Sequence, residues 1–354
     1  MNNVQNKMIF IENSRKEYAL SWIEERWKKG KDFLGTSTGI LCGAMTWVSH
    51  HELVQGVCCA GGFGILAGGS MTPDQLSEQL RYLDNARCRP FGVNLIVFHP
   101  KFQELVDVCG QHKVTHIFLG GGLPSSSVFK SLASYNILPV AFAPSVALAQ
   151  RLIRSGAQAL VIEGHEAGGH VGPVSTQVLA QEILPVLGKE VPIFVAGGIG
   201  NGRGIMSYLF MGASGCQLGS RFVCTHESKA HDAFKEAFIR AHARDAVLSY
   251  GIDARLPVIP VRALSNKATE KFVDFQKDVL KEIEEGIVTL DEGKMKVEHF
   301  WSGALYRAVV KGDVEYGSVM AGQSVGMVKA RESCKEVIQT LTNEMIEAFN
   351  ETCI

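Results

Sequence analysis

Residues 159–198, ALVIEGHEAGGHVGPVSTQVLAQEILPVLGKEVPIFVAGG, decide the fold class of this chain. The stretch begins and ends with short, nearly continuous apolar runs, 159–163 and 192–196, which are typical of strands buried on both faces. Between them, residues 176–187 place apolar side chains at helical spacing. A strand, a helix and a second strand in this order predict a unit of parallel sheet, with glycines directly after each strand.

The same pattern of apolar run, glycine and helix recurs along most of the chain. Helices are expected at 72–85, where Thr72 and Pro73 provide a cap and a first position, and at 146–155, 176–187 and 202–211. A further helix is expected within 42–59, with Ser49 as its cap. The eight predicted strands are 40–45, 62–67, 91–98, 116–120, 138–143, 159–163, 192–196 and 215–222.

Eight strand–helix repeats favour an α/β fold of the (β/α)8 barrel type, the TIM barrel. An open, doubly wound sheet is the alternative, and it would normally carry G-x-G-x-x-G after its first strand. The early glycines of this chain do not have that spacing with a following acidic residue. The sequence therefore predicts a closed barrel.

Beyond residue 222 the alternation stops. Residues 227–245, 267–285 and 298–311 have helical patterns, 249–262 is irregular with two prolines, and a closing helix is expected from Arg331. This segment is too long for an ordinary loop. We therefore expect a barrel formed by 31–222 and 312–354, a smaller helical region (223–311) inserted after the eighth strand and covering the barrel mouth, and an N-terminal extension (1–30).

The composition excludes several classes of protein. The 354 residues are 20% charged with a net charge of −1, so no bulk charge attracts nucleic acid or an anionic membrane. No uninterrupted apolar run reaches the ~18 residues of a membrane span, and no secretory signal is present. The nine cysteines contain no C-x-x-C pair, so reduced thiols in a cytoplasmic protein are expected rather than disulfides or a metal cluster.

Two glycine-rich turns mark a candidate phosphate site. A (β/α)8 barrel has its active site at the carboxyl ends of its strands, with phosphate bound after strands seven and eight. Gly197 and Gly198 follow the seventh predicted strand, and Gly219 and Ser220 follow the sequence Gln217–Leu218 in the eighth. Bare backbone amides in such turns bind phosphate, although each turn alone also serves as an ordinary tight turn.

The sixth strand leads into a loop with several ionisable side chains beside paired glycines. It contains Glu163, His165, Glu166 and His170, the last directly after Gly168 and Gly169. Histidine exchanges protons near neutral pH, so His170 is the candidate general acid or base. Solvated loop residues are the alternative reading. A metal held by two histidines and Glu166 is a third, but the other strand ends offer few further ligands, so no metal is predicted.

The remaining strand ends are polar without being charged. Thr46, Asn94, the glycines from Gly120 to Gly122, and Ser145 supply hydroxyls, an amide and bare backbone. This mixture suits a large neutral heterocycle better than a sugar polyanion. The residues alone therefore predict a barrel that binds a phosphorylated, planar cofactor.

In its motifs the chain resembles the flavin-dependent family that unites nitronate monooxygenases (2-nitropropane dioxygenases) with enoyl-acyl-carrier-protein reductase II. The resemblance covers roughly residues 38–341. It rests on the following matching segments, in chain order: Gly43-Ala44-Met45, Ala60-Gly61-Gly62-Phe63-Gly64, Phe91-Gly92-Val93-Asn94, Glu166-Ala167-Gly168-Gly169-His170, Ala196-Gly197-Gly198-Ile199 and Leu218-Gly219-Ser220-Arg221-Phe222.

The resemblance implies FMN as cofactor and His170 as the catalytic histidine. It implies that the segment containing Met320, Gly322 and Gln323 closes over the far side of the flavin. The other implied contacts are Gly43, Ala44 and Met45 under the isoalloxazine, Asn94 and Glu163 at its polar edge or the ribityl chain, Gly169 nearby, and Gly197, Gly198, Gly219 and Ser220 at the phosphate.

The resemblance also implies an activity. Trp47-Val48, residues 144–149, 261–263 with Asn266, and 312–314 leading to 317–323 look more like the reductase branch. That branch reduces trans-2-enoyl thioesters of acyl-carrier protein in fatty acid synthesis with NADH or NADPH. Cys42 and Ala44 depart from the glycines common in reductases. Oxidation of alkyl nitronates with O₂ is the alternative, and a non-catalytic flavin-binding barrel is a third. A homodimer is expected from the resemblance only.

Overall fold

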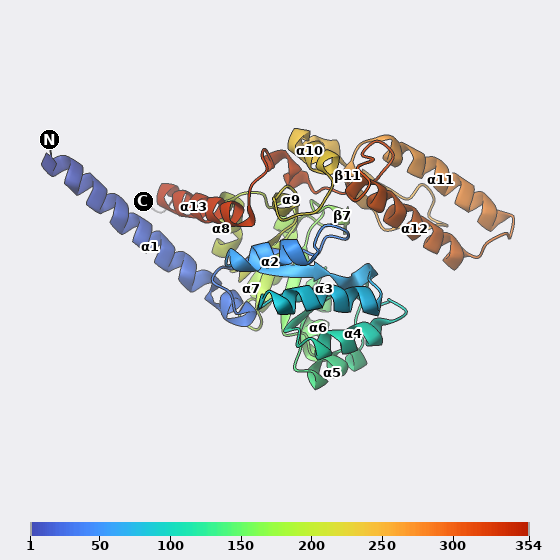
Figure 1. Ribbon diagram of the computed structural model, residues 1–354, viewed down its shortest axis with the longest axis horizontal. Coiled ribbons are helices and arrows are strands. Elements are labelled where there is room, and N and C mark those ends of the chain that lie inside the picture. The colour runs from blue at the N-terminus through green and yellow to red at the C-terminus, as the bar shows by residue number, and fades with distance from the viewer. Residues whose placement is uncertain (1, 353–354) are drawn as a thin grey trace.

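The protein, described by a computed structural model for residues 2–352 with side chains from residue 15 onward, is built around a closed barrel (Figure 1). All eight barrel strands are parallel, and β1 pairs with β9, so the barrel is closed rather than an open sheet. The predicted (β/α)8 fold is thus confirmed. The strands, in barrel order, are β1 (Ile40–Cys42), β2 (Phe63–Ala67), β3 (Gly92–Ile96), β4 (His116–Gly120), β5 (Leu138–Phe142), β6 (Ala159–Glu163), β8 (Ile193–Ala196) and β9 (Gly215–Leu218).

The eighth barrel strand is shorter than its apolar run predicts. β9 ends at Leu218, and the rest of the run forms the short helix α9 (Ser220–Val223). The backbone turns at Gly219, with φ −110° and ψ −67°, because the chain must leave the barrel there. Buried apolar residues on both sides of this turn made strand and helix indistinguishable from periodicity alone.

Helices surround the barrel. Thr72 and Gln75 form a reciprocal cap at the start of α3, as its sequence predicts. Ser49 was predicted to cap α2, but His50 occupies that position, because the Ser49 hydroxyl bonds within the preceding loop. The surrounding helices are α2 (His51–Cys59), α3 (Pro73–Asn85), α4 (Phe102–Gln111), α5 (Ser126–Ser134), α6 (Val146–Ser155), α7 (Thr176–Leu187), α8 (Gly202–Phe210) and α13 (Cys334–Thr352).

The segment between α9 and α13 contains both helices and a small sheet. β10 (Ala246–Ser249) pairs with β11 (Val261–Leu264), which pairs in turn with β7 (Gly169–His170) from the loop after β6. The sequence pattern predicts irregular structure over 249–262, and the pairing of β10 with β11 shows that prediction to be wrong at both ends of the segment. The other partner of β11, β7, lies about 90 residues earlier in the chain, and such pairing leaves no local signal.

Two long helices form a hairpin at one end of the molecule (Figure 1). α11 (Lys267–Glu284) and α12 (Leu290–Val309) enclose a separate apolar cluster in which the rings of Phe272 and Trp301 are 4.3 Å apart. α12 begins eight residues before its predicted start, because Thr289 caps it. The helical pattern at 227–245 is a helix only at α10 (Asp232–Arg240), followed by a single 3₁₀ turn.

The amino-terminal end of the barrel is closed by α1 (Asn2–Leu34), which covers most of the predicted extension. Residue 1 of that extension lies outside the described residues. Leu34 joins the apolar cluster inside the barrel, and His116 Nε2 lies 2.9 Å from the Phe33 carbonyl oxygen. Burial lowers the pKa of His116 to about 4, so its neutral imidazole donates this bond.

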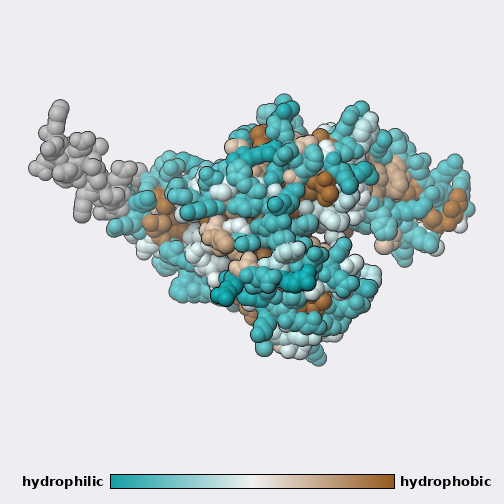
Figure 2. Space-filling model, viewed as in Figure 1, coloured by the Kyte–Doolittle hydropathy of each residue, from teal (hydrophilic) through white to brown (hydrophobic). Residues whose placement is uncertain are grey.

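The outer surface is mainly hydrophilic in the view of Figure 2. Apolar residues gather at the far end of the α11–α12 hairpin, where Ile287 and Met295 are exposed. Among the described residues, no helix combines the length and the apolar character that crossing a bilayer requires.

Candidate functional site

Most of the predicted site residues lie at the carboxyl ends of the barrel strands. The loop after β1, which contains Gly43, Ala44 and Met45, is held by Ser49. Its hydroxyl donates to the Gly43 carbonyl at 2.9 Å and accepts from the Met45 amide at 3.0 Å. This loop is therefore a fixed surface rather than a free turn.

The loop after β1 contacts the end of β9. The Gly43 amide donates to the Leu218 carbonyl, and a Cβ on Gly43 would meet the Gln217 side chain at 3.2 Å. A Cβ on Gly219 would lie 3.4 Å from Met45 Sδ. The predicted flavin loop and one predicted phosphate turn are thus neighbours.

The two predicted phosphate turns follow adjacent strands. Ala196 on β8 pairs with Gln217 on β9, so the turns that begin at Gly197 and Gly219 lie side by side. Gly197 and Gly198 have φ of +93° and +74°, which glycine adopts without strain. Within the described chain, neither amide donates to a protein acceptor.

The loop after β6 is anchored at three points. Glu166 accepts bonds at 2.9 Å from the Thr176 amide and hydroxyl at the start of α7. Arg262, buried on β11, donates to the His165 carbonyl from both Nε and Nη2. The third anchor is the pairing of β7 with β11, which fixes Gly169 and His170. Glu166 and His165 therefore hold the loop, and they do not converge with His170.

The distant segment 320–323 packs on this loop. The Gln323 amide donates to the Glu166 carbonyl at 2.9 Å. A Cβ on Gly168 would meet the Gly322 amide nitrogen at 2.5 Å, and one on Gly169 would lie 3.7 Å from Met320 Sδ. The structure thus brings this segment to the loop that carries His170.

The His170 imidazole projects into solvent with 44% of its side chain exposed. Its Nε2 lies 3.3 Å from Glu298 Oε2 on α12, so the inserted hairpin reaches the predicted catalytic histidine. Glu163, at the end of β6, is half-buried beneath the loop. Burial raises the pKa of Glu163 to about 7, and the charge of His170 opposes this shift.

Replacing Glu163 by Gln is expected to reduce the loss of folding stability that the flavin-free protein shows as the pH rises. With its pKa raised from 4.5 to about 7, Glu163 keeps a proton in the folded state that the unfolded state releases. Its contribution to stability is therefore lost as the pH rises between these two values. Between about pH 5 and about pH 8, the melting temperature should fall further for the wild type than for Glu163→Gln. Equal falls in the two proteins would contradict the raised pKa of Glu163.

Asn94 lies on a different side of the barrel mouth from the phosphate turns. Its Nδ2 donates to the Phe118 carbonyl on β4 at 3.0 Å, and a Cβ on Gly69 would meet its Oδ1 at 3.3 Å. It is half-buried at the end of β3. No direct contact joins Asn94 to Gly197, Gly198 or Ser220 within the described residues, so only a ligand that spans the mouth could touch both.

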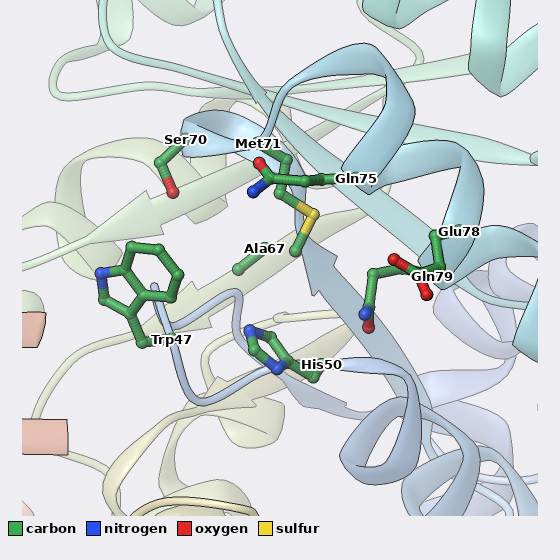
Figure 3. A pocket seen from close by; sticks show the side chains of 8 residues that line it. All are labelled: Trp47, His50, Ala67, Ser70, Met71, Gln75, Glu78 and Gln79. Atoms are coloured by element: carbon green, nitrogen blue, oxygen red, sulfur yellow. The ribbon is translucent and has the colours of Figure 1, made fainter. Parts of the chain in front are cut away.

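A cavity of about 190 Å³ opens beside the loop after β1 (Figure 3). Burial lowers the pKa of His50, so this imidazole is neutral at neutral pH, and Glu78 is the one charged lining group among the described residues. The lining is thus mainly apolar or polar without charge. The cavity is lined by Trp47, His50, Ala67, Ser70, Met71, Gln75, Glu78 and Gln79.

The mouth of the barrel fits the FMN that the motifs imply. Gln217 Oε1 is buried without a hydrogen-bond partner in the described chain, and its side chain lies against Gly43. The free amides of Gly197 and Gly198 offer donors to an anion. An unpaired buried acceptor and free donors at adjacent strand ends are the groups that a flavin with a phosphate tail would satisfy.

The part of the chain that the structure describes also shows how potential metal ligands and thiols are placed. No three His, Cys, Asp or Glu side chains gather there in a metal-binding group. Its eight cysteines are free thiols. Burial raises the pKa of Cys42, Cys109 and Cys216, so these three are packed, unreactive thiols.

Sequence reasoning missed three residues that shape this site. Gln217 had a signal, since it is a polar residue within an apolar strand. Arg262 was noted only as part of a motif, although a buried guanidinium must have acceptors. Glu298 had no local signal, because only the packing of α12 on the barrel brings it to His170.

The profile of the family described as nitronate monooxygenase matches residues 28–107 and 99–344. Among solved structures, FabK from Thermotoga maritima is 34% identical with a TM-score of 0.79, covering 91% of this chain and 97% of that one. Nitroalkane oxidase from Streptomyces ansochromogenes is 23% identical with a TM-score of 0.74, covering 91% of this chain and 99% of that one. At this identity, the likeness shows that the two proteins share a fold.

Curated relatives carry two further descriptions. A (3aS,4S,5R,7aS)-5-hydroxy-7a-methyl-1-oxo-octahydro-1H-indene-4-carboxyl-CoA dehydrogenase of Mycobacterium tuberculosis is 27% identical, over 89% of this chain and 95% of its own length. A probable nitronate monooxygenase of Staphylococcus aureus strain MSSA476 is 25% identical, over 78% of this chain and 92% of its own length.

Proposed function

Because this chain belongs to the nitronate monooxygenase family of oxidoreductases, we propose that it is an FMN-dependent enzyme that reduces trans-2-enoyl thioesters with a reduced pyridine nucleotide. One observation carries the proposal: His170, with its imidazole exposed, is fixed by β7 beside a barrel mouth whose strand ends offer free amides and an unpaired acceptor.

The residues at the mouth have distinct roles toward FMN in this proposal. The amides of Gly197, Gly198 and Ser220 bind its phosphate, and the loop held by Ser49 supports the ring. Gln217 and Asn94 offer amide groups to its polar atoms. The chemistry that the flavin supplies when bound is hydride transfer from the pyridine nucleotide to the β-carbon of the thioester.

The protein's own groups handle charge and protons in this reaction. Negative charge develops on the thioester oxygen, and we assign the Gly168 amide as its donor, because the Gly169 amide lies in the ladder with Arg262. His170 delivers a proton to the α-carbon. The cavity beside Trp47, with apolar walls from Ala67 and Met71, offers space for an uncharged part of the substrate.

Likeness to FabK supports reduction of an enoyl thioester. FabK, an enoyl-acyl-carrier-protein reductase II, shares 34% identity over nearly all of its length. The Mycobacterium tuberculosis relative is named for a coenzyme A thioester, which agrees with a thioester substrate in general. Acyl-carrier-protein thioesters are the substrates that we propose.

Oxidation of alkyl nitronates with O₂ is the second candidate, favoured by the family profile and by the Staphylococcus aureus relative. It would use the same flavin and the same histidine. The two candidates differ in what oxidises the reduced enzyme: an enoyl thioester in one, oxygen in the other.

Anaerobic stopped-flow spectroscopy of the purified, FMN-loaded protein tests the proposal. NADH or NADPH should bleach the flavin absorbance, and crotonyl thioester should restore it faster than oxygen does. The protein should also be yellow and carry about one FMN per chain. Failure of crotonyl thioester to reoxidise the flavin, with rapid turnover of a nitronate under air, would favour the second candidate. Absence of turnover with every donor would indicate a binding protein.

The proposal also covers the cellular location and the oligomeric state of the protein. The described cysteines are free thiols, which suits a protein of the cytoplasm. We propose a homodimer, to be checked by light scattering of the FMN-loaded protein.

A further inference from the structure

The inserted hairpin supplies a carboxylate to the loop that carries His170. Glu298, on the face of α12 toward the barrel, places Oε2 3.3 Å from His170 Nε2, and 47% of its side chain is exposed. The backbone of His170 is fixed by its pairing with Val261 on β11. A fixed backbone and a single side-chain partner leave the imidazole one favoured orientation.

From this geometry we propose that Glu298 is a positioning residue, which fixes the tautomer and orientation of His170 so that Nδ1 is the nitrogen that exchanges protons with substrate. The kinetic consequence rests on the proposed function, but the pairing itself does not.

Hydrogen-bond chemistry dictates the tautomer. An ionised carboxylate only accepts, so Nε2 must carry the proton in a bond to Glu298. A neutral imidazole has one N–H, which leaves Nδ1 as an acceptor. The contact with His170 lowers the pKa of Glu298, so the carboxylate is ionised near neutral pH. Within the described chain, Nδ1 of His170 has no protein partner.

Other charged groups around this pair act from different sides. Glu163 on β6 interacts with His170, whose positive charge opposes the rise in the pKa of Glu163 that burial causes. His299, next to Glu298 on α12, adds positive charge when protonated. Arg262 on β11 directs its guanidinium to the carbonyls of His165 and Ala246, away from the imidazole.

α12 is held at both sides of the barrel mouth. Eight residues beyond Glu298, about 12 Å along the helix, the ring of Tyr306 packs on Trp47 with centroids 5.0 Å apart. The position of α12 is thus fixed, independently of Glu298, by the loop after β1 and by the Ser318 amide, which donates to the Ala304 carbonyl. This explains why a helix outside the barrel can orient a group within the site.

With Nδ1 of His170 as the proton donor, the atoms and electrons of the proposed proton transfer balance. Hydride addition at the β-carbon leaves an enolate, whose electron pair forms the new α-carbon–hydrogen bond as the Nδ1–H bond of the imidazolium breaks. The neutral imidazole keeps Nε2–H toward Glu298. The two electrons come from the reduced pyridine nucleotide, and a proton from water restores the imidazolium.

Nitrogen-15 NMR of the full-length, FMN-loaded protein, labelled at histidine, tests the pairing without turnover. The His170 signals among the 11 histidines are assigned by their loss in His170→Gln. The wild type should show the tautomer protonated at Nε2. In Glu298→Ala this preference should disappear, with both neutral tautomers populated. Glu298→Gln, whose amide oxygen can still accept, should retain the tautomer.

Kinetics then separate positioning from structure. Glu298→Ala should slow reoxidation by crotonyl thioester about five- to tenfold and shift its pH profile, while flavin reduction by NADH is unchanged. Asp291→Asn, which removes one charge from an exposed site on the same helix, is the matched control. It should change neither the rate of reoxidation by crotonyl thioester nor the pH profile of that rate. A wild type protonated at Nδ1, or an unaltered tautomer preference in Glu298→Ala, would overturn the proposal. The expected NMR result without thioester turnover would uphold the pairing and defeat the proposed function instead.

Discussion

His170→Ala is expected to slow reduction of an enoyl thioester by a factor of about 10²–10⁴, because general acid catalysis typically contributes that much. The side chain is exposed at the end of β7, so its removal leaves no cavity in a core. Reduction of the bound flavin by NADH needs no protein acid and should proceed as in the wild type. Single-turnover stopped-flow measurements of the two half-reactions check this split.

His165→Ala is the companion variant. His165 Nδ1 lies 3.1 Å from the Gly172 carbonyl oxygen within the loop, and its position is otherwise held by backbone contacts. The rate should change far less than in His170→Ala. If His170→Ala leaves thioester reduction intact while Glu166→Gln abolishes it, the roles within this loop are reversed.

Gly198→Ala is expected to weaken FMN binding by about tenfold or more, since a left-handed backbone costs a residue with a Cβ roughly 1–2 kcal/mol. The added Cβ would also lie 2.9 Å from Glu166 Cβ, so the turn must shift. The Gly198 amide then moves away from the phosphate that we assign to it. Titration of the flavin-free protein with FMN, followed by quenching of flavin fluorescence, measures the change.

Gly204→Ala is the control for Gly198→Ala. Gly204 lies within α8, where a Cβ would have its nearest contact at 3.5 Å, with Asn201 Oδ1. FMN affinity should therefore be unchanged, and the helix should gain slightly in stability. Equal affinities of the wild type and a folded Gly198→Ala variant would remove Gly198 from the phosphate site.

The barrel could be predicted because each strand is buried on both faces and therefore leaves a continuous apolar run. β4 and β6 have the bounds that their runs predict, and α6 and α7 agree with their spacing. The glycine-rich turns could be located for the same local reason. Each prediction depended on residues that are close together in the sequence.

The contacts that complete the site depend instead on residues far apart in the sequence. β7 has two residues and exists only because β11 pairs with it. Glu298 is one of many exposed acidic residues until α12 packs over His170. Tertiary packing selected these contacts, so no periodicity or motif at either position could identify them.

Closure of the barrel has a consequence for how the chain folds as it is synthesised. Ile40 on β1 pairs with Cys216 on β9, a contact between residues about 175 positions apart, and Phe33 packs on Phe194. α1 contacts α13, α8 and β9, so its buried apolar face emerges from the ribosome long before these partners do. Such a topology predicts slow folding and a nascent chain that depends on chaperones until the last strand is made.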